Sequence, residues 1–374
     1  MAFGSTFGIV HLSRVSLTSW YATSSLASEV EASVSAIVGA TVYFDIHVAL
    51  SDQNLSKVLE FRILTHGYEY LPGSPPFSVG RENSSGARFS KLKRLYIGRN
   101  NLTGSVPYSF GNLSFVAEEN SIGGDIPVDL GRLTNLEVFL LRMNRLVGTI
   151  PFSIFNLSSA TEFNVVMNQI QGSLPRDLGI TLPNLSVFEV GVNSFTRSIP
   201  VSMSNATKLQ RLGLAGNKFT GKVPPLDNLH DLQLLNFHGN GLGAGEANDL
   251  RFLYSLTNVT NLNVLDLSKN NFGGLLHESI GNLSTNLGKL ILSNNGIVGI
   301  IPTGIRNLIN LQILDLSNNN FTGNILADIG KFQKLQNWDL SGNMIYGDIP
   351  LSFGNLTVLT NLMLCNNNLH GRIP

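Results

Sequence analysis

Carboxylates recur at one spacing in this sequence of 374 residues. Asp315 and Asp339 lie 24 residues apart, and each begins an Asp-Leu-Ser string that Asp266 also begins. Two carboxylates on neighbouring turns of a chain can act as the acid and the base or nucleophile of a glycosidase. An internal repeat explains the same spacing more simply, so we predict that the chain is not an enzyme.

Other strings that carry chemistry are incomplete. The glycine-rich stretch 239–245 lacks the third-glycine spacing of a dinucleotide loop, and no Lys-Ser or Lys-Thr follows it. No His-Arg-Asp or Asp-Phe-Gly string of a kinase is present. His230 and His238 are the closest pair among seven scattered histidines, and the single cysteine, Cys365, excludes an intrachain disulfide and a thiolate zinc cluster. We therefore expect no catalytic residue, no cofactor and no metal site.

Composition narrows the kinds of partner. Charged residues make up 13% of the chain, against roughly 25% in an average globular protein. The 25 basic residues balance the 25 acidic ones, so we expect no nucleic-acid partner. No apolar run reaches the roughly 18 residues of a membrane helix, so we expect no membrane-spanning segment in this chain. The mildly apolar residues 1–10 follow no basic residue, so we predict no signal peptide.

An asparagine recurs with a period of 24 residues over most of residues 100–367, which indicates a stack of similar turns. Counting positions so that this asparagine is the ninth, leucine-like residues occupy positions one, four and six, and polar residues alternate with them. This alternation predicts one short strand per turn with one buried face, and stacked turns would pair these strands in a parallel sheet. The recurring asparagines, which we name the asparagine ladder, are Asn100, Asn120, Asn144, Asn168, Asn193, Asn217, Asn240, Asn270, Asn295, Asn319, Asn343 and Asn367.

Three features that recur from turn to turn have physical explanations. A buried carboxamide both donates and accepts, so it can bridge the backbone groups of adjacent turns. Glycine at position thirteen, replaced only by Arg197 and Ala244, predicts a backbone conformation that disfavours side chains. Proline at position sixteen, replaced by Ala247, His277 and Leu326, predicts the end of hydrogen-bonded structure.

The resulting string, L-x-x-L-x-L-x-x-N-x-L-x-G-x-I-P, is nearly whole in residues 136–151 and 335–350, and it resembles the plant-specific class of leucine-rich repeat. One repeat is lengthened to 30 residues by the segment 249–258, and a 25-residue step contains the segment 281–287. With these features, residues 89–374 resemble the ectodomains of plant receptor-like serine/threonine kinases related to the receptor for bacterial elongation factor Tu.

This resemblance implies an α/β-type repeat solenoid: a right-handed superhelix with a parallel sheet on its concave face and an irregular or 3-10 convex side. It also implies a plasma-membrane or extracellular location and a peptide or protein ligand, such as a microbial pattern in defence or a peptide in development. A co-receptor with a similar ectodomain is a further implied partner. In the family one membrane helix and a cytoplasmic kinase follow the ectodomain. A secreted inhibitor of a wall-degrading glycosidase and a non-functional truncated gene product stay open as alternatives.

Two regions depart from the period. Residues 1–88 do not follow it, and we interpret them as a degenerate, poorly ordered segment with damaged repeats. Residues 89–374 form the repeat domain of about twelve repeats, and we expect its last repeat to be truncated. The interval between Asn100 and Asn120 is 20 residues, which predicts that most of one strand is missing and that only residues 115–117 remain of it.

Side chains at positions two, three, five, seven and eight should face the concave side. Centred on Arg142, Glu189 and Arg211, the predicted ligand-binding residues are Arg94, Tyr96, Arg99, Glu137, Leu140, Arg142, Glu162, Glu189, Arg211, Asn236, His238 and Lys269. Met363, Asp266, Asp315 and Asp339 share such positions, and we expect the three aspartates to be structural. If the chain is secreted, we expect glycans on most of its Asn-x-Ser/Thr sites, which in the repeat domain are Asn101, Asn112, Asn156, Asn184, Asn205, Asn258, Asn282, Asn320 and Asn355, with Asn54 and Asn83 before it.

Overall fold

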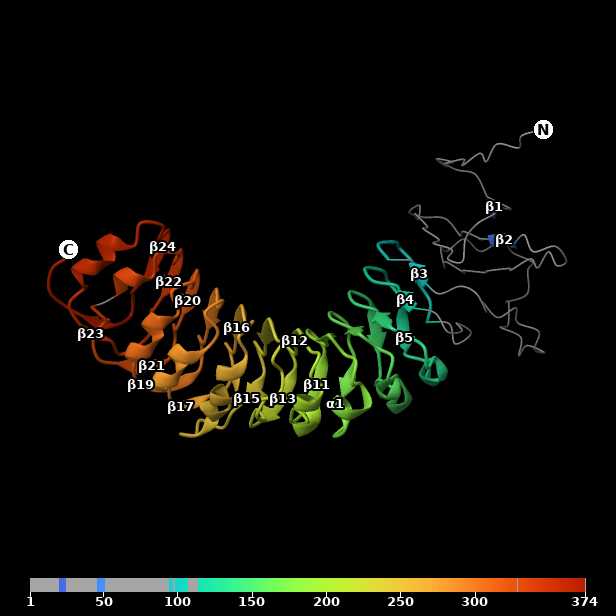
Figure 1. Cartoon of the computed structure of the whole chain (residues 1–374), viewed down its shortest axis with the longest axis horizontal. Coiled ribbons are helices and arrows are strands. Elements are labelled where there is room, and N and C mark those ends of the chain that lie inside the picture. Colours follow the sequence, from blue (N-terminus) through green and yellow to red (C-terminus); the bar gives the residue numbers. More distant parts are fainter. Residues whose placement is uncertain are drawn as a thin grey trace, which may run out of the picture.

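The computed structural model describes residues 20–24, 46–50, 94–96, 98–106, 114–327 and 329–373. From residue 98 onward these residues form an arc of stacked turns, with one long sheet on the inner, concave side and short helical segments on the outer, convex side (Figure 1). Within residues 1–88 only β1 (Trp20–Ser24) and β2 (Ile46–Leu50) are described, as a parallel pair, so the expected damaged repeats lie outside the described residues.

The concave sheet contains one strand from each turn, always at positions three to five. Neighbouring strands are parallel and pair position for position, as in Leu314 with Trp338. The side chains at position four are buried from Phe139 to Trp338, and most of those at positions three and five face outward, so the alternation in the sequence sets this register. Leu362 at position four is 39% exposed, and Val116 and Asn164 at position five are buried. The twelve strands are β3 (Arg94–Tyr96), β4 (Ser114–Val116), β6 (Val138–Leu140), β8 (Glu162–Asn164), β10 (Val187–Glu189), β12 (Arg211–Gly213), β14 (Leu234–Asn236), β16 (Val264–Asp266), β18 (Lys289–Ile291), β20 (Ile313–Asp315), β22 (Asn337–Asp339) and β24 (Asn361–Met363).

The prediction of a missing strand in the short repeat is wrong. β4 has three residues like the other strands of the sheet, and it pairs with β3 on one side and with β6 on the other. The shortening therefore falls outside the strand, and the sheet continues through this turn without a gap.

Smaller parallel sheets follow the ladder asparagines on the lateral side of the arc. Their strands are β5 (Gly123–Asp125) with β7 (Arg145–Val147), then β9 (Gln171–Gly172), β11 (Ser194–Arg197), β13 (Lys218–Gly221) and β15 (Gly241–Leu242), then β17 (Gly273–Leu275), β19 (Gly296–Ile300) and β21 (Asn320–Thr322), and last β23 (Tyr346–Gly347) with β25 (Asn368–Leu369). At position thirteen, the glycines from Gly104 to Gly371 have φ between 70° and 109°, and Arg197 has φ of 69°. The predicted left-handed backbone is therefore confirmed in eleven of the twelve turns, and Arg197 adopts it at a steric cost. Ala244 is the exception, because its φ is not positive, whereas Gly243 and Gly245 on either side of it have φ of 82° and 74°.

Short helical segments form the convex side. Five of them follow a proline at position sixteen whose φ lies between −58° and −66°, as the ring requires. His277 replaces this proline before η5, and its imidazole accepts a hydrogen bond from the Ser279 amide. The segments are η1 (Val128–Arg132), η2 (Phe152–Asn156), α1 (Leu178–Thr181), η3 (Val201–Asn205), η4 (Asp249–Asn258), η5 (Glu278–Asn282), η6 (Thr303–Asn307), η7 (Ile329–Lys331) and η8 (Leu351–Asn355). None of these described helices is long and apolar enough to cross a membrane.

The lengthened repeat has its own anchor. Asp249, at the start of η4, is 3% exposed, and one of its oxygens accepts hydrogen bonds from the amides of Ala244, Glu246 and Gly273. These three amides belong to the loop before η4 and to the next turn. The carboxylate therefore fastens the inserted segment to its neighbour.

The asparagine ladder binds each turn to the one before it. The Asn168 carboxamide accepts a hydrogen bond from the Leu146 amide of the previous turn and donates to the Leu141 carbonyl of that turn. It also donates to the Val165 and Val166 carbonyls of its own turn. Asn144, Asn193, Asn217, Asn240, Asn270, Asn295, Asn319, Asn343 and Asn367 bridge adjacent turns in the same way. A leucine could supply none of these bonds, which explains why the amide recurs.

Candidate ligand-binding surface

The predicted ligand-binding side chains lie on or beside the concave sheet, and none of those whose exposure is described is buried. Glu162 and Arg211 begin strands, Leu140 and Glu189 end strands, and Arg142 lies two residues beyond its strand. Arg94 and Tyr96 lie in β3, and their side chains are outside the description.

The first charged group, which we name the Arg142 cluster, comprises Arg99, Glu118, Glu119 and Arg142 from three consecutive turns. Arg142 Nε donates to Glu118 Oε2 at 2.6 Å, and its Nη2 donates to Glu119 Oε1 at 3.1 Å. Arg99 Nε lies 3.4 Å from Glu119 Oε2. The hydrogen bond to Glu118 raises the pKa of Arg142 against the opposing effect of burial, and the charges of Glu118, Glu119 and Glu189 add to the rise.

The second charged group, the Glu189 cluster, comprises Asn164, Glu189 and Arg211 from three adjacent strands. Glu189 Oε1 accepts two hydrogen bonds from Arg211, at 3.0 and 2.7 Å, and Oε2 accepts one from Asn164 Nδ2 at 2.8 Å. The three residues at the predicted centre, Arg142, Glu189 and Arg211, therefore lie in two clusters of charged neighbours with different partners.

Position five has a structural role in five turns, as expected for the aspartates. Asp315 Oδ1 accepts from both the amide and the hydroxyl of Ser317, which closes a turn after the strand. Asp266 and Asp339 do the same with Ser268 and Ser341. Asn164 and Asn236 accept the amide two residues on. Glu189 occupies the same position without this bond to its own backbone, and its carboxylate serves neighbouring turns instead.

Ser268 also lies 2.8 Å from Nδ1 of His238. The aspartate–serine–histidine series resembles a nucleophilic triad only in composition. The serine hydroxyl donates to Asp266, so the histidine must donate to the serine and cannot remove its proton.

The remaining predicted residues are separate: Glu137, Glu162 and Lys269 form no ion pair with any residue that the structure describes. No group of three potential metal ligands occurs in the described part of the chain.

Position eight has a left-handed backbone in all twelve turns. Its φ lies between 50° and 66° from Arg99 to Asn366. Glycine and asparagine adopt this conformation most readily, and they occupy six of these positions: Gly216, Gly239, Asn294, Asn318, Gly342 and Asn366.

Three consecutive turns place apolar residues at position eight, and we name Met143, Met167 and Val192 the Met–Val ridge. Their exposed fractions are 39%, 46% and 52%, so they fill no space in the core. A β-branched residue with φ of 52°, as at Val192, is a genuine backbone outlier. The ridge continues the position-eight row from Arg99 and Glu119, and Arg142 directly precedes Met143.

The predictions from the sequence missed six residues of this surface. Asn164 lies at position five, as Glu189 does, but was not predicted to belong to the site. Glu118 and Glu119 lie in the turn whose strand was expected to be lost. Met143, Met167 and Val192 were available in the sequence as departures from asparagine or glycine at position eight, but that signal acquires a meaning only when the left-handed backbone is known.

Comparisons with known proteins agree with this architecture. Residues 285–345 match a family model described as "Leucine rich repeat", and residues 91–113 and 261–283 match a second model with the same description. The matched residues contain the repeat string, so the leucine-rich-repeat solenoid is established as the fold.

Among curated proteins, the chain is 43% identical over 86 residues to the LRR receptor-like serine/threonine-protein kinase EFR of Arabidopsis thaliana. It is 45% identical over 86 residues to the receptor kinase-like protein Xa21 of Oryza sativa subsp. japonica. Each match covers 23% of this chain and 8% of the relative's length, so it concerns a small part of each receptor.

Among solved structures, the chain resembles the crystal structure of PEPR1–AtPEP1, with a TM-score of 0.69 and 29% identity over 76% of this chain and 40% of that one. It also resembles the Arabidopsis receptor kinase HAESA in complex with the peptide hormone IDA and the co-receptor SERK1, with a TM-score of 0.64 and 27% identity over 76% of this chain and 51% of that one. The chain therefore spans about half or less of these solved chains.

Proposed function

We propose that this chain is the ligand-binding part of a plant cell-surface receptor and that it binds a peptide along the N-terminal half of its concave face. The observation that carries the proposal is the Met–Val ridge. Three consecutive exposed apolar side chains hold a backbone conformation that disfavours them, in a row where six turns have asparagine or glycine and three have the charged residues Arg99, Glu119 and Lys269. Strain of this kind is characteristic of functional sites.

The dimensions of the surface fit an extended peptide. The Arg142 cluster, the Met–Val ridge and the Glu189 cluster span six turns, and parallel strands lie about 4.8 Å apart, so the surface is about 24 Å long. An extended chain advances about 3.3 Å per residue, so about seven residues cover this length. The ligand would place apolar side chains on the ridge, between groups of both charge signs.

The relatives extend the proposal to a whole receptor. We assign the chain to the receptor-kinase subfamily related to the receptor for bacterial elongation factor Tu, in agreement with the similarity to EFR and Xa21. The location would be the plasma membrane with the solenoid outside the cell, and the signal would be one of defence or development. The HAESA complex contains a co-receptor, which supports a second partner with a similar ectodomain.

The positions of the glycosylation sequences are compatible with this location. Asn156, Asn205, Asn258, Asn282 and Asn355 each end a 3-10 segment of the convex side and are exposed. Asn101 and Asn320 are exposed on the lateral side, Asn184 is half-buried, and Asn112 lies outside the described residues. No described member of this set lies in the concave sheet, so glycans would leave the proposed peptide surface free.

A capture experiment tests the peptide site. The chain, produced in plant cells, would be exposed to a library of random peptides about 10 residues long, somewhat longer than the surface. The matched variant is Met143→Asn/Met167→Asn/Val192→Asn, because Asn294, Asn318 and Asn366 occupy the same position with the same backbone. We expect the native chain to enrich peptides with adjacent apolar and charged residues and the folded variant to lose them.

The control is Asn294→Met/Asn318→Met, which places similar side chains on the C-terminal half. If this control and the ridge variant capture the same peptides as the native chain, the ridge is not the binding site. Capture of no peptide by the native chain would contradict the proposed function itself.

A further inference from the structure

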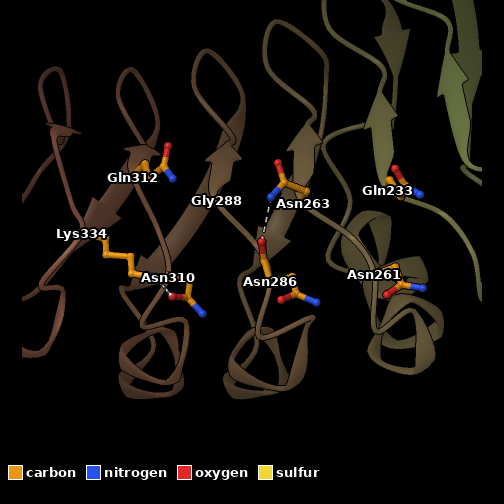
Figure 2. A pocket seen from close by; sticks show the side chains of 8 residues that line it. All are labelled: Gln233, Asn261, Asn263, Asn286, Gly288, Asn310, Gln312 and Lys334. Atoms are coloured by element: carbon orange, nitrogen blue, oxygen red, sulfur yellow. Dashed lines mark hydrogen bonds between the residues drawn. The ribbon is translucent and has the colours of Figure 1, made fainter.

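A shallow hollow of about 510 Å³ lies in the C-terminal half of the arc, away from the proposed peptide surface. It is formed where five consecutive turns pass from the convex side into the concave sheet, and residues at position two and two residues before it line the hollow (Figure 2). We name it the amide hollow, and its lining residues are Gln233, Asn261, Asn263, Asn286, Gly288, Asn310, Gln312 and Lys334.

The hollow is present because one side chain is missing from a row. Position two carries Gln233, Asn263, Gln312 and Gln336 in the surrounding turns but Gly288 between them. The Gly288 backbone does not have a positive φ, and an added Cβ would meet Asn263 Nδ2 at 3.5 Å, an ordinary contact. The backbone therefore does not require glycine here, and its effect is to leave space.

Part of the lining is held in place. Asn263 Nδ2 donates to the Asn286 carbonyl at 3.0 Å, and Asn310 Nδ2 donates to the Thr285 carbonyl at 2.7 Å. Lys334 Nζ donates to Asn310 Oδ1 at 2.7 Å (Figure 2). These bonds run between adjacent turns, so the side chains of Asn263, Asn310 and Lys334 are held in place before any ligand binds.

The rest of the lining is available. The carboxamides of Gln233, Asn261 and Gln312 make no hydrogen bond to any residue that the structure describes, and all three side chains are exposed. Each offers two N–H donors and a carbonyl acceptor. The free amides lie on both sides of the gap at Gly288 (Figure 2).

The lining excludes most classes of ligand. It contains no carboxylate that would bind a cation and no apolar side chain that would bind a lipid, and its one cation, Lys334, already bonds to Asn310. A volume in the range of about 300–1,000 Å³ is typical of ligand sites, but those sites are mostly apolar. A hydroxyl group both donates and accepts, as a carboxamide does, so amides complement a neutral ligand rich in hydroxyl groups.

We propose that the amide hollow binds a neutral saccharide, with Gln233, Asn261 and Gln312 hydrogen-bonding its hydroxyl groups. This site is separate from the proposed peptide surface and does not depend on it. Two sources offer this chemistry: a free oligosaccharide, or an N-glycan of the chain itself. Asn258 and Asn282 are exposed glycosylation sequences that lie three and four residues before Asn261 and Asn286.

Calorimetric titration of the full chain, freed of N-glycans, with cellotetraose, mannotetraose and chitotetraose tests the first source. We expect millimolar binding of at least one of them, because the lining has no aromatic ring to stack on a sugar. Gly288→Gln completes the amide row with a residue that the neighbouring turns already accept, and it should weaken binding by roughly tenfold or more. Gln312→Leu, which keeps the size and removes the amide, should also weaken binding.

The matched control is Thr360→Gln, which adds the same side chain at position two of a turn outside the hollow. Equal binding by the native chain, Gly288→Gln and Thr360→Gln would overturn the proposal. So would stronger binding of tetragalacturonate that depends on Lys334 and not on Gly288, since the ligand would then be an anion.

Hydrogen exchange tests the second source. The glycosylated chain is compared with Asn258→Gln/Asn282→Gln, and slower exchange around residues 261–263 and 286–288 only in the glycosylated native chain would identify the chain's own glycan as the occupant. If none of the three sugars binds and this exchange does not differ, the proposal is wrong. Neither result depends on the peptide capture described above.

Discussion

The turns around Asn144, Asn168 and Asn193 and the turns around Asn295, Asn319 and Asn343 share one ladder and one strand register, yet they differ at three other positions. In the N-terminal set, position eight carries Met143, Met167 and Val192, position five includes Glu189, and position four is phenylalanine. In the C-terminal set, position eight carries asparagine or glycine, position five includes Asp315 and Asp339, and position four is leucine or tryptophan.

This difference distinguishes the residues that the fold requires at positions five and eight from those that it does not require. The C-terminal set shows that asparagine or glycine at position eight, and a short aspartate at position five, satisfy the backbone completely. The N-terminal set departs from the first solution at Met143, Met167 and Val192 and from the second at Leu140 and Glu189, on the exposed side of the same sheet. The proposed peptide site accounts for these departures, because exposed side chains in a left-handed backbone do not contribute to the core.

Removing a ladder amide should have the largest effect, and the same one in both halves. Asn168→Leu and Asn319→Leu each leave one amide and one carbonyl of the previous turn without their partner. Each buried group left unpaired costs about 1–3 kcal/mol, so we expect a loss on the order of 3 kcal/mol in the free energy of unfolding. Urea unfolding measures it, and a loss confined to one half would show that the two halves do not share one scaffold.

Placing valine at position eight of the C-terminal half should have the next largest effect. Asn318 has φ of 50°, and a valine there would meet the strain that Val192 carries. We expect Asn318→Val to lower the unfolding free energy by about 1–2 kcal/mol. Asn318→Gly is the control and should have a much smaller effect. Equal stability of the two variants would mean that the backbone at position eight relaxes and that the ridge is not strained.

The opposite substitution should stabilise the N-terminal half. Val192→Asn removes a β-branched side chain from φ of 52° without removing a buried contact, so we expect a gain of about 1 kcal/mol. Thermal unfolding of this variant against the native chain measures the gain. A loss of stability would indicate that Val192 packs for the benefit of the fold, which contradicts the functional interpretation of the ridge.

The smallest expected effect is a dependence on pH in the C-terminal half. Burial acts to raise the pKa of Glu278, but hydrogen bonds from Gly304 and Thr303 and the charge of Arg306 lower it overall. The stability that this carboxylate contributes is therefore present above the unfolded pKa of about 4.3 and lost as the pH falls through the lower folded value. We expect Glu278→Gln to show a slightly shallower loss of melting temperature in acid. An identical dependence of the melting temperature on pH would show that the bonds from Glu278 of η5 to Thr303 and Gly304 of η6 add no pH-dependent stability.

The repetitive features of the fold were predictable because the sequence pattern of each one recurs many times in the chain. The ladder, the strand register, the left-handed position thirteen and the prolines before the 3-10 segments follow from hydrogen bonding and sterics that act alike in most turns. The prediction of a lost strand failed because the four-residue shortening was assigned to the strand, whereas β4 keeps its three residues and its pairing.

The candidate sites were less predictable because they consist of departures. The Arg142 cluster depends on which carboxylates face Arg142 across a turn boundary, and the Met–Val ridge depends on the backbone at position eight. The amide hollow depends on a single missing side chain at Gly288 and on the alignment of residues 24, 25 or 30 positions apart. A consensus of the repeat averages over all turns, so it does not contain these departures in single turns.

The phenylalanines at position four have a mechanical consequence. The rings of Phe139, Phe163 and Phe188 stack with centroids 5.0 and 5.3 Å apart, somewhat more than the strand spacing of about 4.8 Å. Flat rings in contact cannot be pressed closer, whereas leucines at the same position can change rotamer. We therefore expect the arc to bend mainly in the turns that carry leucine at position four, and the turns of Phe139, Phe163 and Phe188 to be stiffer.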